Sequence, residues 1–145
     1  MKKRTKAREY AVQMMYQSEI VGHQPEEVMT VFWKSFEEGC TETVCFAERL
    51  FAGAYSRCAE NDSLITQFLK DSWSFERLGE VEKCVLRVGI YELLHSDTPK
   101  YAVLDDYVTL TRCFTDEKTT AFVNGIMESI YRSFAGDGTA INNGE

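Results

Sequence analysis

The stretch EVEKCVLRVGIYELLH, residues 80–95, decides the fold class of this 145-residue chain. Its apolar side chains surround the predicted helix: Val81 and Val85 share one side, while Leu86 and Ile90 lie on others. A helix that is apolar all round is stable only when other elements cover it on every side. We therefore expect residues 80–95 to form the central helix of a single domain.

Helical periodicity continues on both sides of this stretch, without an alternating strand pattern or an internal repeat. In residues 3–20, Ala7, Ala11 and Met14 fall on one stripe and Tyr16 lies roughly opposite. The predicted class is therefore all-α, with about seven helices. Before the central helix, we expect a helix from Pro25 to about Glu38 and a longer stretch from Thr41 to Leu69, which divides at Asn61 or Asp62. An irregular connection or a single turn is expected over Asp71–Leu78. After the central helix, we expect one helix from Thr98 or Pro99 to Phe114 and a last helix, capped by Thr119 or Thr120, through Phe134.

Length and composition favour a soluble domain. A chain of about 150 residues buries roughly 68 to 70% of its unfolded surface, enough for a core without metals or disulfides. No apolar run reaches the roughly 18 residues that a membrane span requires. We therefore expect a soluble, cytoplasmic protein. Residues 136–145 are rich in Gly and Asn and are expected to form a disordered tail.

The five cysteines are expected to be buried thiols in a reducing compartment. They are odd in number, contain no CxxC pair and stand among apolar neighbours. Neither His23 nor His95 lies at ligand spacing from another candidate, so we expect no metal site and no cofactor. The cysteines are Cys40, Cys45, Cys58, Cys84 and Cys113.

The sequence offers no residue pattern typical of an enzyme. It contains no P-loop, dinucleotide-binding, HExxH or GxSxG motif. Asp105 and Asp106 are neighbours on a predicted helix and point about 100° apart, which favours a solvated helix start over a catalytic pair. Glu92 lies on an apolar face and must be neutral or paired, with a helix terminus or an arginine such as Arg87. We expect no catalytic activity.

Positive charge is concentrated at the N-terminus. The chain has 16 Lys plus Arg against 23 Asp plus Glu, for a net charge of −7. Five of the cations lie in residues 1–8, a basic arm leading into the first helix, which leaves −12 on the remainder. A polyanion attracted to the arm would be repelled by most of the remaining surface. The other interpretation is that these cations only aid solubility.

An aromatic and an amide side chain follow the basic arm on the same predicted helix. Tyr16 lies opposite the apolar stripe, flanked by Lys6 and Gln13. Single-stranded RNA suits this set, because cations track phosphate, an exposed ring stacks on a base and an amide contacts a base edge. The alternative is that Tyr16 packs against a second bundle.

Four stretches resemble the NusB family of transcription antitermination factors. RTKAREYAVQMMY (residues 4–16) resembles the family's opening, VEKCVLRVGIYEL (81–93) its central helix, residues 99–114 its next helix, and FVNGIM (122–127) part of its last helix. The resemblance implies a non-enzymatic domain over residues 3–135, built from two packed three- or four-helix bundles. It also implies binding of boxA-type single-stranded RNA in nascent ribosomal RNA leaders, jointly with the small-subunit ribosomal protein NusE, in an RNA polymerase antitermination complex.

Candidate contacts follow from the resemblance and from spacing. Lys118 stands just before the last predicted helix, about one turn from Phe122, and adds a cation. Three glutamates crowd the start of the central helix and are the expected landing points for NusE, although a helix N-terminus favours acids by itself. The RNA candidates are Lys2, Lys3, Arg4, Lys6, Arg8, Gln13, Tyr16, Lys118 and Phe122, and the protein-partner candidates are Glu76, Glu80 and Glu82.

Two other functions fit the same residues. The chain would be a helical adaptor that binds only proteins, with its acidic body as the working surface. Alternatively, it would be a stand-alone RNA-binding domain akin to the one that precedes some RNA methyltransferases. A filter-binding assay with boxA-like RNA separates the adaptor from the RNA-binding functions.

Overall fold

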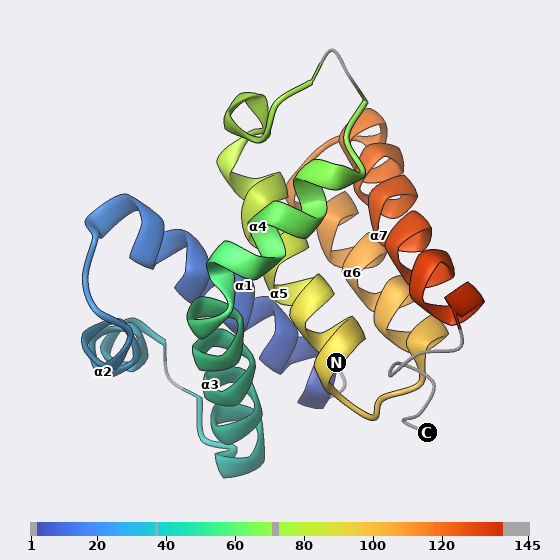
Figure 1. Ribbon diagram of the computed structural model, residues 1–145. Coiled ribbons are helices and arrows are strands. Elements are labelled where there is room, and N and C mark those ends of the chain that lie inside the picture. Colours follow the sequence, from blue (N-terminus) through green and yellow to red (C-terminus); the bar gives the residue numbers. More distant parts are fainter. Residues whose placement is uncertain (1–2, 37, 71–72, 138–145) are drawn as a thin grey trace.

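The computed structural model describes residues 3–36, 38–70 and 73–137, with side chains as far as Phe134. These residues form seven α-helices and one 3-10 turn, and none of the described helices is long and apolar enough to cross a membrane. Lys2 and residues 138–145 of the predicted tail lie outside the described residues. The elements are α1 (Lys3–Val21), α2 (Pro25–Ser35), α3 (Thr41–Ser56), α4 (Cys58–Gln67), η1 (Phe75–Arg77), α5 (Glu80–His95), α6 (Lys100–Phe114) and α7 (Glu117–Asp137) (Figure 1).

Helix α5 is the centre of the molecule. It packs against α1, α3, α4, α6 and α7, and every residue from 84 to 90 is buried. At Gly89 a Cβ atom would lie 2.8 Å from Met127 Cε of α7 and 3.2 Å from Tyr107 Cγ of α6, so the missing side chain permits this close approach. The prediction that residues 80–95 form the central helix is confirmed.

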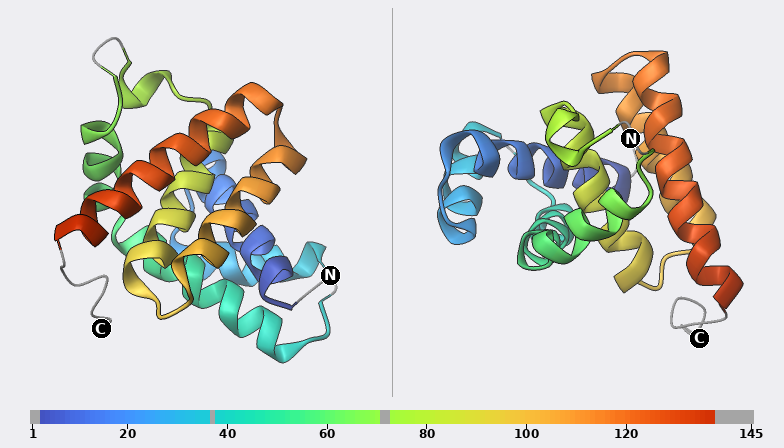
Figure 2. Two further views of the ribbon diagram at one scale, coloured as in Figure 1. Left: turned by 90° about the vertical axis from the view of Figure 1, so that its right-hand side faces the viewer. Right: turned by 45° about the horizontal axis from the view of Figure 1, so that its top comes forward.

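Two helical bundles meet at α5. Helices α1, α2 and α3 pack on one another, α4 links α3 to α5, and α5, α6 and α7 form the second group. Figure 2 shows α2 on the far side of α1 from α7, so the first bundle extends away from the second. The predicted all-α architecture is confirmed.

The second helix is shorter than predicted. It ends at Ser35, and Phe36 is extended (φ −122°, ψ 123°), so the helix does not reach Glu38. The carboxylate of Glu38 instead accepts hydrogen bonds from Tyr10 Oη at 2.9 Å and from the backbone N–H of Cys40 at 3.0 Å. These contacts tie the α2–α3 connection to α1, which the helical pattern alone did not indicate.

The division between α3 and α4 falls at Arg57 rather than at Asn61 or Asp62. Asn61 is buried within α4, and its Nδ2 donates to the backbone carbonyl of Arg87 at 3.3 Å. Asp62 accepts from Arg87 Nε and Nη2 at 2.9 and 2.8 Å. Residues that favour helix ends in isolation are held inside a helix here by partners on α5.

The last helix has a different cap from the predicted one. Asp116, rather than Thr119 or Thr120, precedes α7, and its Oδ1 accepts the backbone N–H of Thr119 at 2.8 Å. That hydrogen bond holds the pKa of Asp116 below its usual value. Asp is a strong N-cap residue because its side chain satisfies a free N–H of the first turn. The helix also continues to Asp137, beyond the predicted end at Phe134.

The prediction of five buried cysteines is wrong for four of them. Cys84 is fully buried, and burial raises the pKa of its thiol to about 12. Cys40 and Cys58 are half-buried, and Cys45 and Cys113 are exposed. Apolar neighbours in sequence do not imply burial, because each helical residue points about 100° away from the next.

Two helix glycines should respond oppositely to alanine. A Cβ at Gly125 in α7 meets nothing within 4 Å, whereas one at Gly53 in α3 overlaps the ring of Tyr91. We expect Gly125→Ala to raise the free energy of unfolding by about 0.5–1 kcal/mol, because alanine has less backbone freedom to lose. Gly53→Ala should lower it by about 1–3 kcal/mol through overpacking. Urea midpoints measure both, and equal shifts would contradict the helix packing.

Candidate nucleic-acid interface

Helix α1 separates a core face from an outer face as predicted. Ala7, Ala11 and Met14 are fully buried, whereas Tyr16 is 43% exposed. Gln13 is half-buried beside it. The ring lines a cavity together with residues of α5 and α6, so the alternative that Tyr16 also packs against the second bundle stays open.

A small apolar cavity adjoins the Tyr16 ring. Its volume is about 180 Å³, and Gln13 lies on its wall with an Oε1 that is buried and has no hydrogen-bond partner among the described residues. A buried acceptor without a partner is uncommon and calls for an explanation, such as a group that binds there. The cavity is lined by Val12, Gln13, Tyr16, Val81, Cys84 and Phe114.

Arg8, a predicted RNA contact, lies in the core instead of on the surface. It is 5% exposed, and its Nε and Nη2 donate to Glu92 Oε1 and Oε2 at 2.8 and 2.6 Å. Its Nη1 donates to Asp106 Oδ2 at 2.8 Å. Burial by itself lowers the pKa of Arg8, but hydrogen bonds and charge from Glu92 outweigh it and raise the pKa above its usual value. We therefore leave Arg8 out of the proposed RNA surface.

Glu92 is paired, as a buried carboxylate must be, but not with Arg87. Its partners are Arg8, the hydroxyl of Tyr107 at 2.8 Å and the hydroxyl of Thr98 at 3.4 Å. Burial, and then the charge of Glu92, raise the pKa of Tyr107 well above its usual value. Arg87 stands about 140° around α5 from Glu92 and binds Asp62 on α4 instead.

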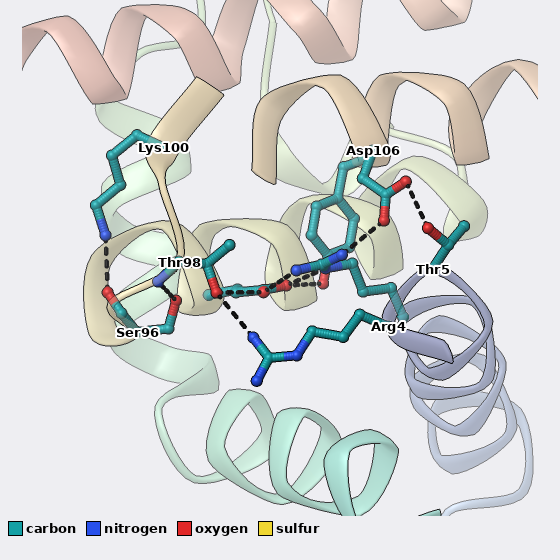
Figure 3. Close-up of polar contacts among 9 residues, drawn as sticks. Arg4, Thr5, Ser96, Thr98, Lys100 and Asp106 are labelled. Carbon is teal, nitrogen blue, oxygen red and sulfur yellow. Dashed lines mark hydrogen bonds and ion pairs between the residues drawn. The ribbon is translucent and has the colours of Figure 1, made fainter. Parts of the chain in front are cut away.

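The two adjacent aspartates do not form a solvated helix start. Helix α6 begins at Lys100, so both lie in its second turn. Asp105 is exposed, whereas Asp106 faces α1, where its Oδ1 accepts from Thr5 Oγ1 at 3.1 Å (Figure 3). The second carboxylate oxygen binds Arg8. They point apart, as expected, but Asp106 is part of the packing between α1 and α6.

The first turn of α1 faces α3. Figure 3 shows Arg4 extending from α1 toward Thr98, whose Oγ1 lies 3.5 Å from Arg4 Nη1. Arg4 and Lys3 line a cavity of about 370 Å³ together with Phe46 and Arg49 of α3. Phe46 and Arg49 are not among the candidates predicted from the sequence. Their i, i+3 spacing shows that they share a face, but not that this face meets the start of α1.

The remaining RNA candidates lie at separate places. Lys6 Nζ is 5.0 Å from the ring centroid of Tyr10. Lys118 is exposed at the start of α7 and makes no ion pair with any described residue. Phe122 is tilted against Trp73, with ring centroids 6.1 Å apart, and these two line a cavity of about 400 Å³ that Tyr16 does not reach. Trp73 is a further aromatic that the sequence argument did not single out.

Four candidates follow one winding path on α1. At 3.6 residues per turn, Gln13, Lys6 and Lys3 lie about 60°, 80° and 140° around the helix axis from Tyr16, always in the same direction. We call these four side chains the α1 track. It joins the apolar cavity at Tyr16 to the cavity of about 370 Å³ at the N-terminal end of α1. We call the latter the basic cavity, because Lys3, Arg4 and Arg49 line it together with one acid, Glu42.

The chain matches the sequence model of the NusB family over residues 5–132. The chain belongs to the NusB family. It is 32% identical over 128 residues to the transcription antitermination protein NusB of Anaeromyxobacter dehalogenans (strain 2CP-1 / ATCC BAA-258), an alignment that covers 88% of this chain and 89% of that protein. Membership makes it a transcription antitermination factor and not an enzyme, as predicted.

Solved NusB structures share the fold. The solution structure of NusB from Aquifex aeolicus has a TM-score of 0.81 and 30% identity, and covers 97% of this chain and 95% of that one. A crystal structure of the antitermination factors NusB and NusE in complex with dsRNA has a TM-score of 0.84 and 32% identity, and the match covers 92% of this chain and 99% of that one.

The three glutamates expected to receive NusE surround the start of α5 in this NusB-family chain. Glu76 is exposed in η1. Glu80 lies 3.7 Å from Lys83 Nζ, and Glu82 Oε2 accepts the backbone N–H of Gly79 at 3.2 Å. Glu80 and Glu82 therefore also stabilise the helix start, and their contact with a partner stays a prediction.

The buried pair should dominate the stability of this chain. Arg8→Gln leaves the carboxylate of Glu92 without its main partner in the core, and we expect a loss of about 3–5 kcal/mol in the free energy of unfolding. Lys3→Gln is the control. It breaks the exposed ion pair with Glu42 and should leave the denaturant midpoint nearly unchanged. Similar midpoints for the two variants would show that Arg8 is not the core partner.

Proposed function

We propose that this chain binds boxA-type single-stranded RNA in nascent ribosomal RNA leaders along the α1 track. It would do so jointly with a NusE-type ribosomal protein, in an RNA polymerase antitermination complex. Lys118, exposed four residues beyond Phe114 of the apolar cavity, would extend the RNA surface onto α7. Phe122, on the same side of α7 one turn later, would contact the RNA beyond that point.

The half-exposed Tyr16 ring beside the unpartnered Gln13 carbonyl carries this proposal. A base stacked on the ring can place its edge in the apolar cavity and donate a hydrogen bond to Gln13 Oε1. Lys6 and Lys3 then follow the strand as phosphate contacts. The surface therefore combines stacking, edge recognition and charge along one helix.

A basic protein partner would supply the positive charge that most of this surface lacks. Outside residues 1–8 the chain carries a net −12, which repels RNA and attracts a cationic protein. The solved complex of another NusB with NusE and dsRNA supports a joint assembly. Because that RNA is double-stranded, the strandedness of the ligand is part of the test.

Tyr16→Ala should weaken RNA binding without affecting folding. Loss of a stacking ring costs about 1–3 kcal/mol of binding free energy. Tyr101→Ala is the matched control, since Tyr101 is 77% exposed at the start of α6 and lies outside the α1 track. Filter binding would use a boxA-like single strand, a scrambled strand and a duplex. Urea midpoints should stay unchanged for both variants.

Several outcomes of that assay contradict the proposal. Equal RNA affinities for Tyr16→Ala and Tyr101→Ala would show that no base stacks on Tyr16. Tighter binding of the duplex would exclude a single-strand preference. No RNA binding, with NusE binding retained, would favour the adaptor that binds only proteins.

Neutralising the glutamates around the start of α5 should slow NusE association. We expect the triple change Glu76→Gln, Glu80→Gln and Glu82→Gln to lower the association rate constant roughly tenfold at low salt, because steering by opposite charge is reduced. Glutamine keeps an acceptor for Gly79. A control with Glu26→Gln, Glu27→Gln and Glu60→Gln removes the same charge elsewhere. Equal rate constants for the two triple variants would place the NusE face elsewhere.

A further inference from the structure

We propose that Arg4 and Arg49 form an oxyanion-binding site that holds a phosphate group of the RNA on the α3 side of α1. This inference rests on the proposed function and extends it by pairing Arg4 with Arg49, a residue that neither the family resemblance nor spacing identified. The site is the basic cavity of about 370 Å³ between the first turn of α1 and α3.

Both guanidinium groups are held against one aromatic ring. Arg4 Cζ lies 4.4 Å and Arg49 Cζ 5.8 Å from the ring centroid of Phe46. Arg4 comes from α1 and Arg49 from α3, so the site exists only where these two helices pack. Arg4 Nη1 also donates to Thr98 Oγ1 at 3.5 Å, and contact with the ring face leaves the other N–H groups of Arg4, and those of Arg49, available for an anion.

The cations around this cavity are not all neutralised. Lys3 is paired with Glu42 at 2.6 Å, and Arg8, also near the Phe46 ring, is neutralised by Glu92 and Asp106. Arg4 and Arg49 make no ion pair with any described residue. Each of these two unpaired cations lies well within a Debye length, roughly 10 Å, of the Phe46 ring centroid, so salt screens the positive potential at the cavity only partly. An anion bound there would relieve this potential.

The chemistry favours phosphate. The planar fork of arginine donates two parallel hydrogen bonds to phosphate oxygens, and two forks on one cavity can hold opposite sides of the group. The position also suits RNA, because the α1 track ends at Lys3, which lines the same cavity. A strand that stacks on Tyr16 and passes Lys6 would therefore bring a backbone phosphate to this site.

The test compares Arg49→Gln with Arg57→Gln, an exposed arginine at the far end of α3 that is paired with Glu60. RNA affinity is measured across salt concentrations on the full chain. Loss of one phosphate contact should reduce the slope of log affinity against log salt by about 0.7, which the control should not do. Arg49→Lys keeps the charge and should keep the slope.

Competition by inorganic phosphate gives an independent measurement. At millimolar concentration, phosphate should compete with RNA for the wild type and should compete less effectively for Arg49→Gln.

Shortening the RNA at the end that reaches the cavity gives a second measurement. Below a certain length, wild type and Arg49→Gln should bind equally, while the effect of Tyr16→Ala persists. The inference is overturned if Arg49→Gln and Arg57→Gln have the same slope while Tyr16→Ala still weakens binding, and the proposed function then stands. It is also overturned if Arg49→Gln weakens the binding of an acidic protein and not of RNA. If the wild type binds no RNA, the proposed function and this inference are both wrong.

Discussion

The ion pair between Arg8 and Glu92 is the constraint on which the rest of the structure depends. Removing two charges from water is costly, and the cost is offset only when the geometry is good and the remaining lone pairs are satisfied. Here Arg8 donates to both oxygens of Glu92, and Tyr107 and Asp106 complete the group. The pair therefore joins α1, α5 and α6 in one fixed arrangement.

That arrangement also sets the outer surface of α1. With Ala7, Arg8, Ala11 and Met14 facing the core, the helical repeat leaves Tyr16 partly exposed and Gln13 half-buried beside the apolar cavity. The same register brings Arg4 to α3 and leaves Lys6 between the two cavities. Folding and the proposed RNA contacts thus share one helix, and a change in its register would affect both.

Charge distribution explains why a basic arm in an acidic protein can still act locally. Of its five cations, Arg8 is buried in the core and paired with Glu92, and the exposed Lys3 forms an ion pair with Glu42. Arg49, distant in sequence, adds a positive group where the first turn of α1 meets α3. Fewer cations are therefore available to RNA than the arm contains, but two of the positive groups are oriented by the Phe46 ring. A small positive surface fits RNA binding that is shared with a cationic protein partner.

The sequence by itself determined the all-α class, the central helix and the exposed side of α1, because helical periodicity depends only on neighbours three and four residues apart. It also identified the family from motifs that lie in order along the chain. Only the tertiary structure decided which charge is buried, since the partners of Arg8 are 84 and 98 residues away. The same reason applies to the Arg4 and Arg49 cavity, to the end of α2 at Ser35 and to the division between α3 and α4 at Arg57. Each depends on contacts between elements, and one helix cannot encode which neighbour it will meet.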